Sequence, residues 1–178
     1  LLKNKHKTNE IELQHKTIYV LPSKLGGQFL LIALLNFVMG INYQNNLILA
    51  MAYLMVVVLV FAILTGYKNV RGLSVKYLSV NESYAPNSPV ARFQIHAQSH
   101  CELIKLVNDN LESETVSLQS KEKKTVEIAL KSSERGAYGF DRIKIISHFP
   151  FGLVSVWSYI EPTETVYVYP QPIATEKL

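Results

Sequence analysis

The chain has 178 residues, of which 48% are hydrophobic and only 18% are charged, and its formal net charge is +4. Soluble globular domains carry about a quarter charged residues, so we expect part of this surface to face something other than water. The single cysteine, Cys101, excludes an internal disulfide framework. A modest net charge without a basic stripe of interleaved aromatics argues against nucleic-acid binding.

The charged residues are distributed unevenly along the chain. None occurs between Lys24 and Lys68, whereas they recur regularly outside that stretch. The lysines that precede the uncharged stretch are Lys3, Lys5, Lys7, Lys16 and Lys24. We therefore predict a basic juxtamembrane segment at 1–24, a membrane part at 25–67 and a water-facing domain at 73–170.

Two apolar runs in the uncharged stretch predict a transmembrane helical hairpin. As helices, residues 25–41 would extend about 25 Å and residues 47–67 would extend about 31 Å. The hydrocarbon core of a bilayer is about 30 Å thick. Helices buried in a soluble core are the alternative, but the chain is too small to enclose both runs. We expect the Asn36 amide to hydrogen-bond to the second helix. In the turn, which contains Asn45, we expect Tyr43 at the headgroup boundary.

The basic residues that flank the hairpin lie on its open side. After the second run these are Lys68, Arg71 and Lys76. The positive-inside rule then predicts that both termini and the following domain are cytoplasmic, and that the turn faces the other compartment.

From Leu73 onward the hydrophobic period changes from helical to two. Alternating runs occur at 93–98, 126–130, 143–145, 154–156 and 166–169, with turn-forming stretches between them. Such runs predict antiparallel sheets with one buried face, and seven or eight strands would match an immunoglobulin-like β-sandwich. The predicted fold class is an α+β membrane protein, in which a two-helix transmembrane hairpin precedes this sandwich.

Aromatic residues of the β region allow more than one interpretation. Tyr138 precedes a strand expected near Phe140 and fits either a tyrosine-corner hydrogen bond or a partly buried strand edge. Trp157, with Phe151 and Tyr159, fits core or sheet-edge packing, and a ligand platform is the alternative.

The sequence contains no complete catalytic or metal-binding pattern. His96, His100 and Cys101, with His148 as a fourth ligand, provide one close group, whereas zinc sites usually bring their ligands in pairs. A Gly-rich phosphate loop and a nucleophile elbow are both missing. We therefore predict a protein that is not an enzyme and has no cofactor.

Short segments in a recognisable order extend along nearly the whole chain. They are Ile18-Tyr19-Val20-Leu21-Pro22-Ser23, Gly26, Phe29, Ile41-Asn42-Tyr43-Gln44-Asn45-Asn46-Leu47, Lys68-Asn69-Val70-Arg71-Gly72-Leu73, Arg135-Gly136-Ala137-Tyr138, Phe149-Pro150-Phe151-Gly152-Leu153 with Trp157, and Tyr167-Val168-Tyr169-Pro170. This set resembles bacterial membrane proteins of the domain-of-unknown-function 58 family. The family's Asp-Phe…Gly-Leu-Arg…Gly-Asp…Trp-Lys segment is absent, so we interpret 171–178 as a tail that leads to a missing C-terminal region.

The resemblance implies a protein of the bacterial inner membrane and supplies no catalytic residues. Members of the family are often encoded beside a MoxR-type AAA+ ATPase, von Willebrand factor A-type proteins and a transglutaminase-like membrane protein. The resemblance therefore implies these proteins as partners. The candidate interaction or structural residues are Asn36, Tyr43, Asn45, Arg71, Arg135, Gly136, Tyr138, Pro150, Phe151, Gly152 and Trp157.

Three functional hypotheses follow. The first is a membrane-anchored, non-enzymatic interaction or assembly module, which the lack of a catalytic pattern favours. The second is a protein that binds a small molecule or an envelope precursor through the aromatic cluster of Trp157. The third is a structural subunit of a larger membrane complex, in which Asn36 and the glycines of the hairpin face neighbouring helices.

Overall fold

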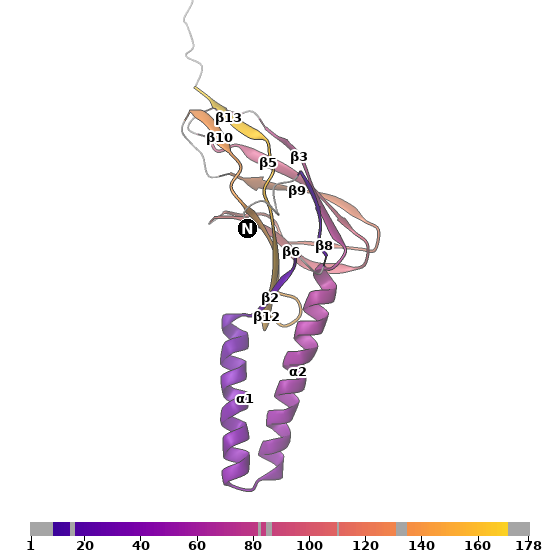
Figure 1. Cartoon of the computed structure of the whole chain (residues 1–178), viewed down its shortest axis with the longest axis vertical. Helices are drawn as coiled ribbons and strands as arrows, with labels where there is room; N and C mark the ends of the chain where they lie inside the picture. Colours follow the sequence, from indigo (N-terminus) through magenta and orange to yellow (C-terminus); the bar gives the residue numbers. More distant parts are fainter. Residues whose placement is uncertain are drawn as a thin grey trace, which may run out of the picture.

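The computed structural model describes residues 9–14, 17–81, 83–84, 87–109, 111–130 and 135–170. Most lysines of the predicted juxtamembrane segment (Lys3, Lys5, Lys7 and Lys16) and the predicted tail 171–178 lie outside the described residues. The described part of the chain is a long helical hairpin that projects from one end of a β domain (Figure 1).

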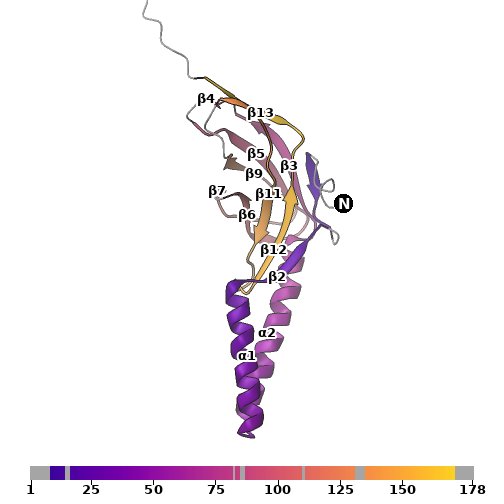
Figure 2. The same cartoon turned by 60° about the vertical axis from the view of Figure 1, so that its left-hand side comes forward.

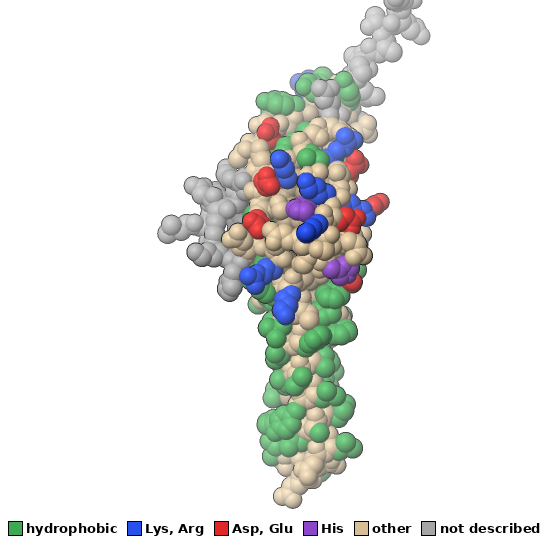
Figure 3. Space-filling view, turned by 90° about the vertical axis from the view of Figure 1, so that its right-hand side faces the viewer, with side chains coloured by type: hydrophobic (Ala, Val, Ile, Leu, Met, Phe, Trp, Pro, Cys, Tyr) green, Lys and Arg blue, Asp and Glu red, His purple; other side chains and the backbone are tan. Residues whose placement is uncertain are grey.

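Both predicted helices are confirmed, as α1 (Lys24–Asn42) and α2 (Asn46–Val70). Each is long and apolar enough to cross a membrane, and only 17% of its most apolar window is buried within the molecule. Hydrophobic side chains cover the visible face of the hairpin, whereas the charged ones lie on the β domain and at its boundary with the hairpin (Figure 3). The hairpin therefore exposes an apolar surface.

Local contacts explain how the hairpin closes. The Asn45 side chain caps α2 by accepting hydrogen bonds from the backbone N–H groups of Leu47 (3.0 Å) and Ile48 (3.3 Å). At Gly40 the helices approach so closely that an added Cβ would lie 2.9 Å from the backbone nitrogen of Leu49. A glycine at this position therefore allows the two helices to meet beside the turn.

Thirteen strands make up the described β domain. They are β1 (Glu10–Glu12), β2 (Tyr19–Pro22), β3 (Leu73–Val80), β4 (Ser83–Tyr84), β5 (Val90–Ala97), β6 (Cys101–Asn108), β7 (Leu111–Glu112), β8 (Val116–Leu118), β9 (Lys123–Ala129), β10 (Gly136–Gly139), β11 (Ile143–Ser147), β12 (Val154–Ile160) and β13 (Thr165–Tyr169). The five predicted alternating runs lie in β5, β9, β11, β12 and β13 and are confirmed as strands.

The strands form three sheets in two layers. One sheet has the order β1-β3-β5-β9, the second has the order β2-β12-β11-β6-β7 with β8 on β6, and a small third sheet has the order β10-β13-β4. Figure 2 shows β3, β5 and β9 behind β2, β12 and β11. Inward-facing side chains such as Phe93, Ile95, Ile145 and Val156 are fully buried and belong to one core. The described pairs are antiparallel except β13 with β4, which is parallel.

The structure differs from the predicted domain plan before the hairpin. Segment 1–24 is more than a basic juxtamembrane segment, because β1 pairs with β3 and β2 pairs with β12. Ile11 and Leu13 are buried in the core. The hairpin is thus inserted between β2 and β3 of one β domain.

Two further expectations for the β region were wrong. The strand expected to begin near Phe140 begins at Ile143 as β11, and Tyr138 lies within β10 rather than just before a strand. The described chain from β3 to β13 also holds eleven strands rather than seven or eight. Several of the additional strands are only two to four residues long, too short for an alternating pattern to reveal them.

Candidate functional site

The C-terminal end of α2 is joined to the β domain by Asn69. Its Nδ2 donates to the backbone oxygen of Glu102 (2.8 Å) and to Oγ of Ser147 (3.0 Å), and its Oδ1 accepts from the N–H of Glu102 (2.8 Å). The Asn69 side chain is only 6% exposed, so water does not compete for these bonds. One amide therefore fixes α2 to both β6 and β11.

The N-terminal end of α1 is joined to the loop between β11 and β12. The backbone N–H of Ser23 donates to the carbonyl oxygen of Leu153 (2.9 Å), and Ser23 Oγ accepts from the N–H of Gly26 (3.0 Å). Ser23 is thereby the N-cap of α1. A Cβ at Gly26 would lie 2.0 Å from the Leu153 oxygen, so only glycine permits this approach.

The same loop also contacts α2, and it lies between the two helices (Figure 1). A Cβ at Gly66 would lie 2.8 Å from the carbonyl oxygen of Phe149. Of the predicted residues in this loop, Pro150 is buried, Phe151 is 68% exposed, and Gly152 has a φ of 69°, which favours glycine. Ser23, Gly26, Gly66, Asn69 and loop 148–153 are called the junction below.

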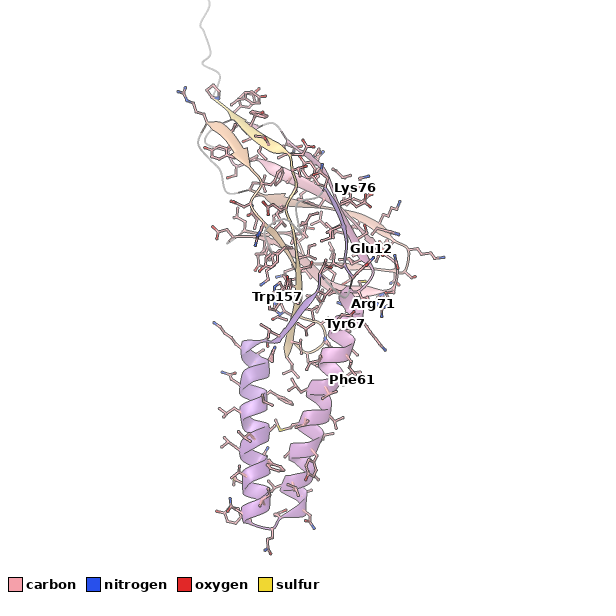
Figure 4. The ribbon with its side chains drawn as sticks, viewed as in Figure 1. Glu12, Phe61, Tyr67, Arg71, Lys76 and Trp157 are labelled. Atoms are coloured by element: carbon pink, nitrogen blue, oxygen red, sulfur yellow. The ribbon has the colours of Figure 1, made fainter. Side chains whose placement is uncertain are left out.

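Arg71 lies beside the junction, directly after α2. Figure 4 shows Phe61, Tyr67 and Arg71 in succession along the end of α2, with Glu12 of the β domain close to Arg71. An open cleft of about 690 Å³ is present here. Among its lining residues are Thr65, Lys68, Arg71, Gln98, Ser99 and His100. We call it the basic cleft.

Trp157 lies on the outward face of β12 rather than in the core. Its ring stacks on Tyr19 of β2 with 6.1 Å between centroids, and the Nζ of Lys144 lies 4.7 Å from the Trp157 ring centroid. Tyr159 shares this face, whereas Phe151 belongs to the junction. The inward positions of β12 carry Val154, Val156, Ser158 and Ile160, so the odd-numbered residues must face outward.

The predicted residues Arg135, Gly136 and Tyr138 lie at the opposite end of the β domain. Gly136 and Tyr138 belong to β10, which pairs with β13 far from the hairpin (Figure 1). The same small sheet carries three exposed tyrosines, Tyr84, Tyr167 and Tyr169, with exposed fractions of 45%, 56% and 43%. The rings of Tyr84 and Tyr169 are 6.0 Å apart. We call these three residues the distal tyrosine patch.

The predicted hairpin residues make contacts within the chain. Asn36 Nδ2 lies 3.6 Å from Sδ of Met55, which confirms the expected contact with the second helix. Asn45 caps α2, and Tyr43 is 73% exposed at the tip. Because Asn36, Gly26 and Gly40 all face their own chain, they offer little to a neighbouring helix.

Two of the histidines that suggested a metal site, His100 and His148, contact other side chains. His100 Nε2 pairs with Glu102 Oε1 (2.8 Å), and His148 Nδ1 is 3.1 Å from Ser155 Oγ. Partial burial and the nearby Lys105 and Lys144 lower the pKa of His148. Burial raises the pKa of the Cys101 thiol. Within the described ranges, His, Cys, Asp and Glu form no group of three with metal-binding geometry.

In comparisons with known proteins, no family model, no curated protein and no solved structure matches the chain. The resemblance to the domain-of-unknown-function 58 family therefore stays a prediction. Two features of the structure bear on function, the junction with its basic cleft and the distal tyrosine patch.

Proposed function

We propose that this chain is a membrane-anchored, non-enzymatic interaction module. Its hairpin crosses the inner membrane of a bacterium, and its β domain, an immunoglobulin-like sandwich in this proposal, binds a protein partner on the cytoplasmic side. The observation that carries the proposal is the placement of an apolar hairpin and an exposed tyrosine patch at opposite ends of one molecule.

The exposed surface of the hairpin supports membrane anchoring. Leu34, Val57 and Leu64 are 57%, 63% and 57% exposed, and similar side chains continue along both helices. Soluble monomers rarely expose contiguous apolar patches larger than a few hundred Å². The exposed cations Lys24, Lys68 and Arg71 all flank the open end, which supports a cytoplasmic β domain.

The distal tyrosine patch supports protein binding. Tyrosine is enriched at protein–protein interfaces, where a large ring with a polar tip contributes strongly to affinity. Partner binding by strand addition has less support at β9, because Lys123 and Lys124 are exposed on that edge strand. A ligand platform on Trp157 also has less support, because Tyr19 and Lys144 already cover the indole.

The resemblance suggests a MoxR-type AAA+ ATPase as the partner, with von Willebrand factor A-type and transglutaminase-like proteins as the other candidates. The test is co-purification of the full chain from native membranes in mild detergent, with and without ATP, followed by mass spectrometry. We expect the ATPase to co-purify with the unmodified protein. The variant Tyr84→Ser/Tyr167→Ser/Tyr169→Ser should weaken its binding by about 30-fold or more, because a hot-spot residue contributes about 2 kcal/mol.

The matched control is Tyr43→Ser, which removes an exposed tyrosine from the other end of the molecule. It should retain the ATPase. If the triple variant also retains the ATPase while the protein stays folded, the patch is not the binding surface. If the chain purifies alone under all conditions, the interaction-module proposal is wrong.

A further inference from the structure

The basic cleft lies where the apolar part of α2 ends. Phe61 and Leu64 are more than half exposed, and Lys68 and Arg71 follow within two turns. In Figure 3 basic side chains lie directly above the green surface of the hairpin. In a membrane this is the level of the lipid headgroups, where Lys and Arg side chains meet phosphate groups.

The cations of the cleft lack a carboxylate partner within the described part of the chain. Four other basic side chains do pair with glutamates, namely Lys76 with Glu10 (3.9 Å), Arg92 with Glu127 (2.8 Å), Lys105 with Glu112 (2.9 Å) and Arg142 with Glu161 (3.4 Å). No such pair forms at Lys68 or Arg71 among the described residues. Both side chains are exposed and can take an external anion.

Two acidic residues near the cleft, Glu12 and Glu102, are engaged with other partners. Glu102 pairs with His100, while the carboxylate of Glu12 accepts hydrogen bonds from the amides of Gln98 (3.0 Å) and Gln14 (3.3 Å). Glu12, Arg71 and Gln98 also line a neighbouring cleft of about 440 Å³. Among the described residues no ion pair joins Glu12 to Arg71, so the guanidinium remains available.

We propose that the basic cleft binds the phosphate of an anionic phospholipid headgroup, with Lys68 and Arg71 as the cationic ligands. The hydroxyl and amide of Ser99 and Gln98 line the same cleft and suit the polar part of a headgroup. This inference rests on the proposed membrane anchoring and is independent of the protein partner.

Position favours a lipid over a free phosphate. The exposed apolar side chains of Phe61 and Leu64 lie one helical turn before Thr65 and Lys68, which line the cleft. Acyl chains can lie along these side chains while the headgroup occupies the cleft. A soluble phosphate would gain only the polar contacts. A phospholipid would also be supplied at high local concentration by the membrane itself.

The test uses the full chain in detergent, titrated with phosphatidylglycerol or phosphatidylcholine and followed by native mass spectrometry. We expect phosphatidylglycerol to bind about 30-fold more tightly, as expected for two cations that contribute about 1 kcal/mol each. Lys68→Gln/Arg71→Gln should abolish this preference. The control Lys76→Gln/Arg92→Gln removes the same charge from the outer face of β3 and β5 and should retain it.

Each other outcome overturns the proposal. If the unmodified chain binds the two lipids equally, the cleft does not select a headgroup. The same conclusion holds if the control variant loses the preference for phosphatidylglycerol as fully as Lys68→Gln/Arg71→Gln does. Displacement of phosphatidylglycerol by an excess of inorganic phosphate would assign the cleft to a soluble ligand. Alkaline carbonate extraction separates the two proposals, because a chain that leaves the membrane under carbonate contradicts the anchoring itself.

Discussion

The Asn69 side chain satisfies both backbone polar groups of Glu102, and it does so where α2 meets β6 and β11. The carbonyl of Glu102 has a second partner, since Ser147 Oγ donates to it (3.1 Å). The N–H of Glu102 depends on Asn69. A buried donor left without a partner costs about 1–3 kcal/mol, so the amide is the sensitive point of the junction.

We predict that Asn69→Ala destabilises the protein by about 1–3 kcal/mol, because it leaves the N–H of Glu102 unpaired. The fluorescence of Trp157, the single tryptophan, reports unfolding in urea for the full chain in detergent. The control Asn81→Ala, at an exposed position after β3, should change the free energy of unfolding by less than about 0.5 kcal/mol. Equal effects of the two substitutions would contradict the role of Asn69.

Cys101 offers a second test at the residue scale. Its thiol is fully buried, donates to the carbonyl oxygen of Ser99 (3.2 Å) and has a raised pKa because of burial. Since the thiolate is the reactive form, maleimide should label Cys101 at least about 100-fold more slowly in the folded protein than in urea. A Cys101→Ala/Ser120→Cys variant, with an exposed cysteine, should react rapidly in both states.

The sequence predicts the contacts of some polar residues of the hairpin but not of others. The contact of Asn36 was foreseen because a polar side chain inside an apolar run has few partners other than the facing helix. Asn69 and Ser23 were missed, because a polar residue at the end of an apolar run looks like an ordinary boundary residue. Their burial depends on β6, β11 and loop 148–153, which are distant in the sequence.

At the scale of elements, the β11–β12 loop is placed against α1 and α2 by two glycines. Gly26 brings the first turn of α1 against the oxygen of Leu153, and Gly66 brings α2 against that of Phe149. Gly27, one residue along α1, has nothing within 4 Å of an added Cβ. The chain therefore provides its own comparison between a packed and an open glycine.

We predict that Gly26→Ala destabilises the protein by about 1–3 kcal/mol, because the methyl group forces the helix away from the loop. Gly27→Ala should be neutral or stabilising by up to about 1 kcal/mol, because alanine has the higher helix propensity. Thermal unfolding in detergent, followed by circular dichroism, compares the two variants. If both behave alike, the close approach at Gly26 is not maintained in solution.

The prediction of elements succeeded where the hydrophobic pattern was regular. The period of two in β5 and β12 appears directly in the sequence. The pattern fails in β6, where a shift in register between Cys101 and Ile104, with Leu103 at a φ of 54°, interrupts the alternation. In β1 only three residues form the strand, which is too short to stand out in a lysine-rich segment.

At the scale of the whole molecule, the proposed orientation can be tested by thiol labelling. In a Cys101→Ala background, Tyr43→Cys places a thiol at the tip of the hairpin and Ser120→Cys places one on the β domain. A membrane-impermeant maleimide should label the first in spheroplasts and the second only after lysis. The reverse pattern would contradict a cytoplasmic β domain.

The insertion of the hairpin between β2 and β3 also affects the order of events during synthesis. Val20 of β2 pairs with Val156 of β12, so about 130 residues must be translated before the partner strand exists, a delay on the order of ten seconds. In the proposed topology the hairpin enters the bilayer during that interval. The nascent β2 would then be tethered at the membrane surface with an open backbone edge, and the membrane would hold it in position until β12 leaves the ribosome.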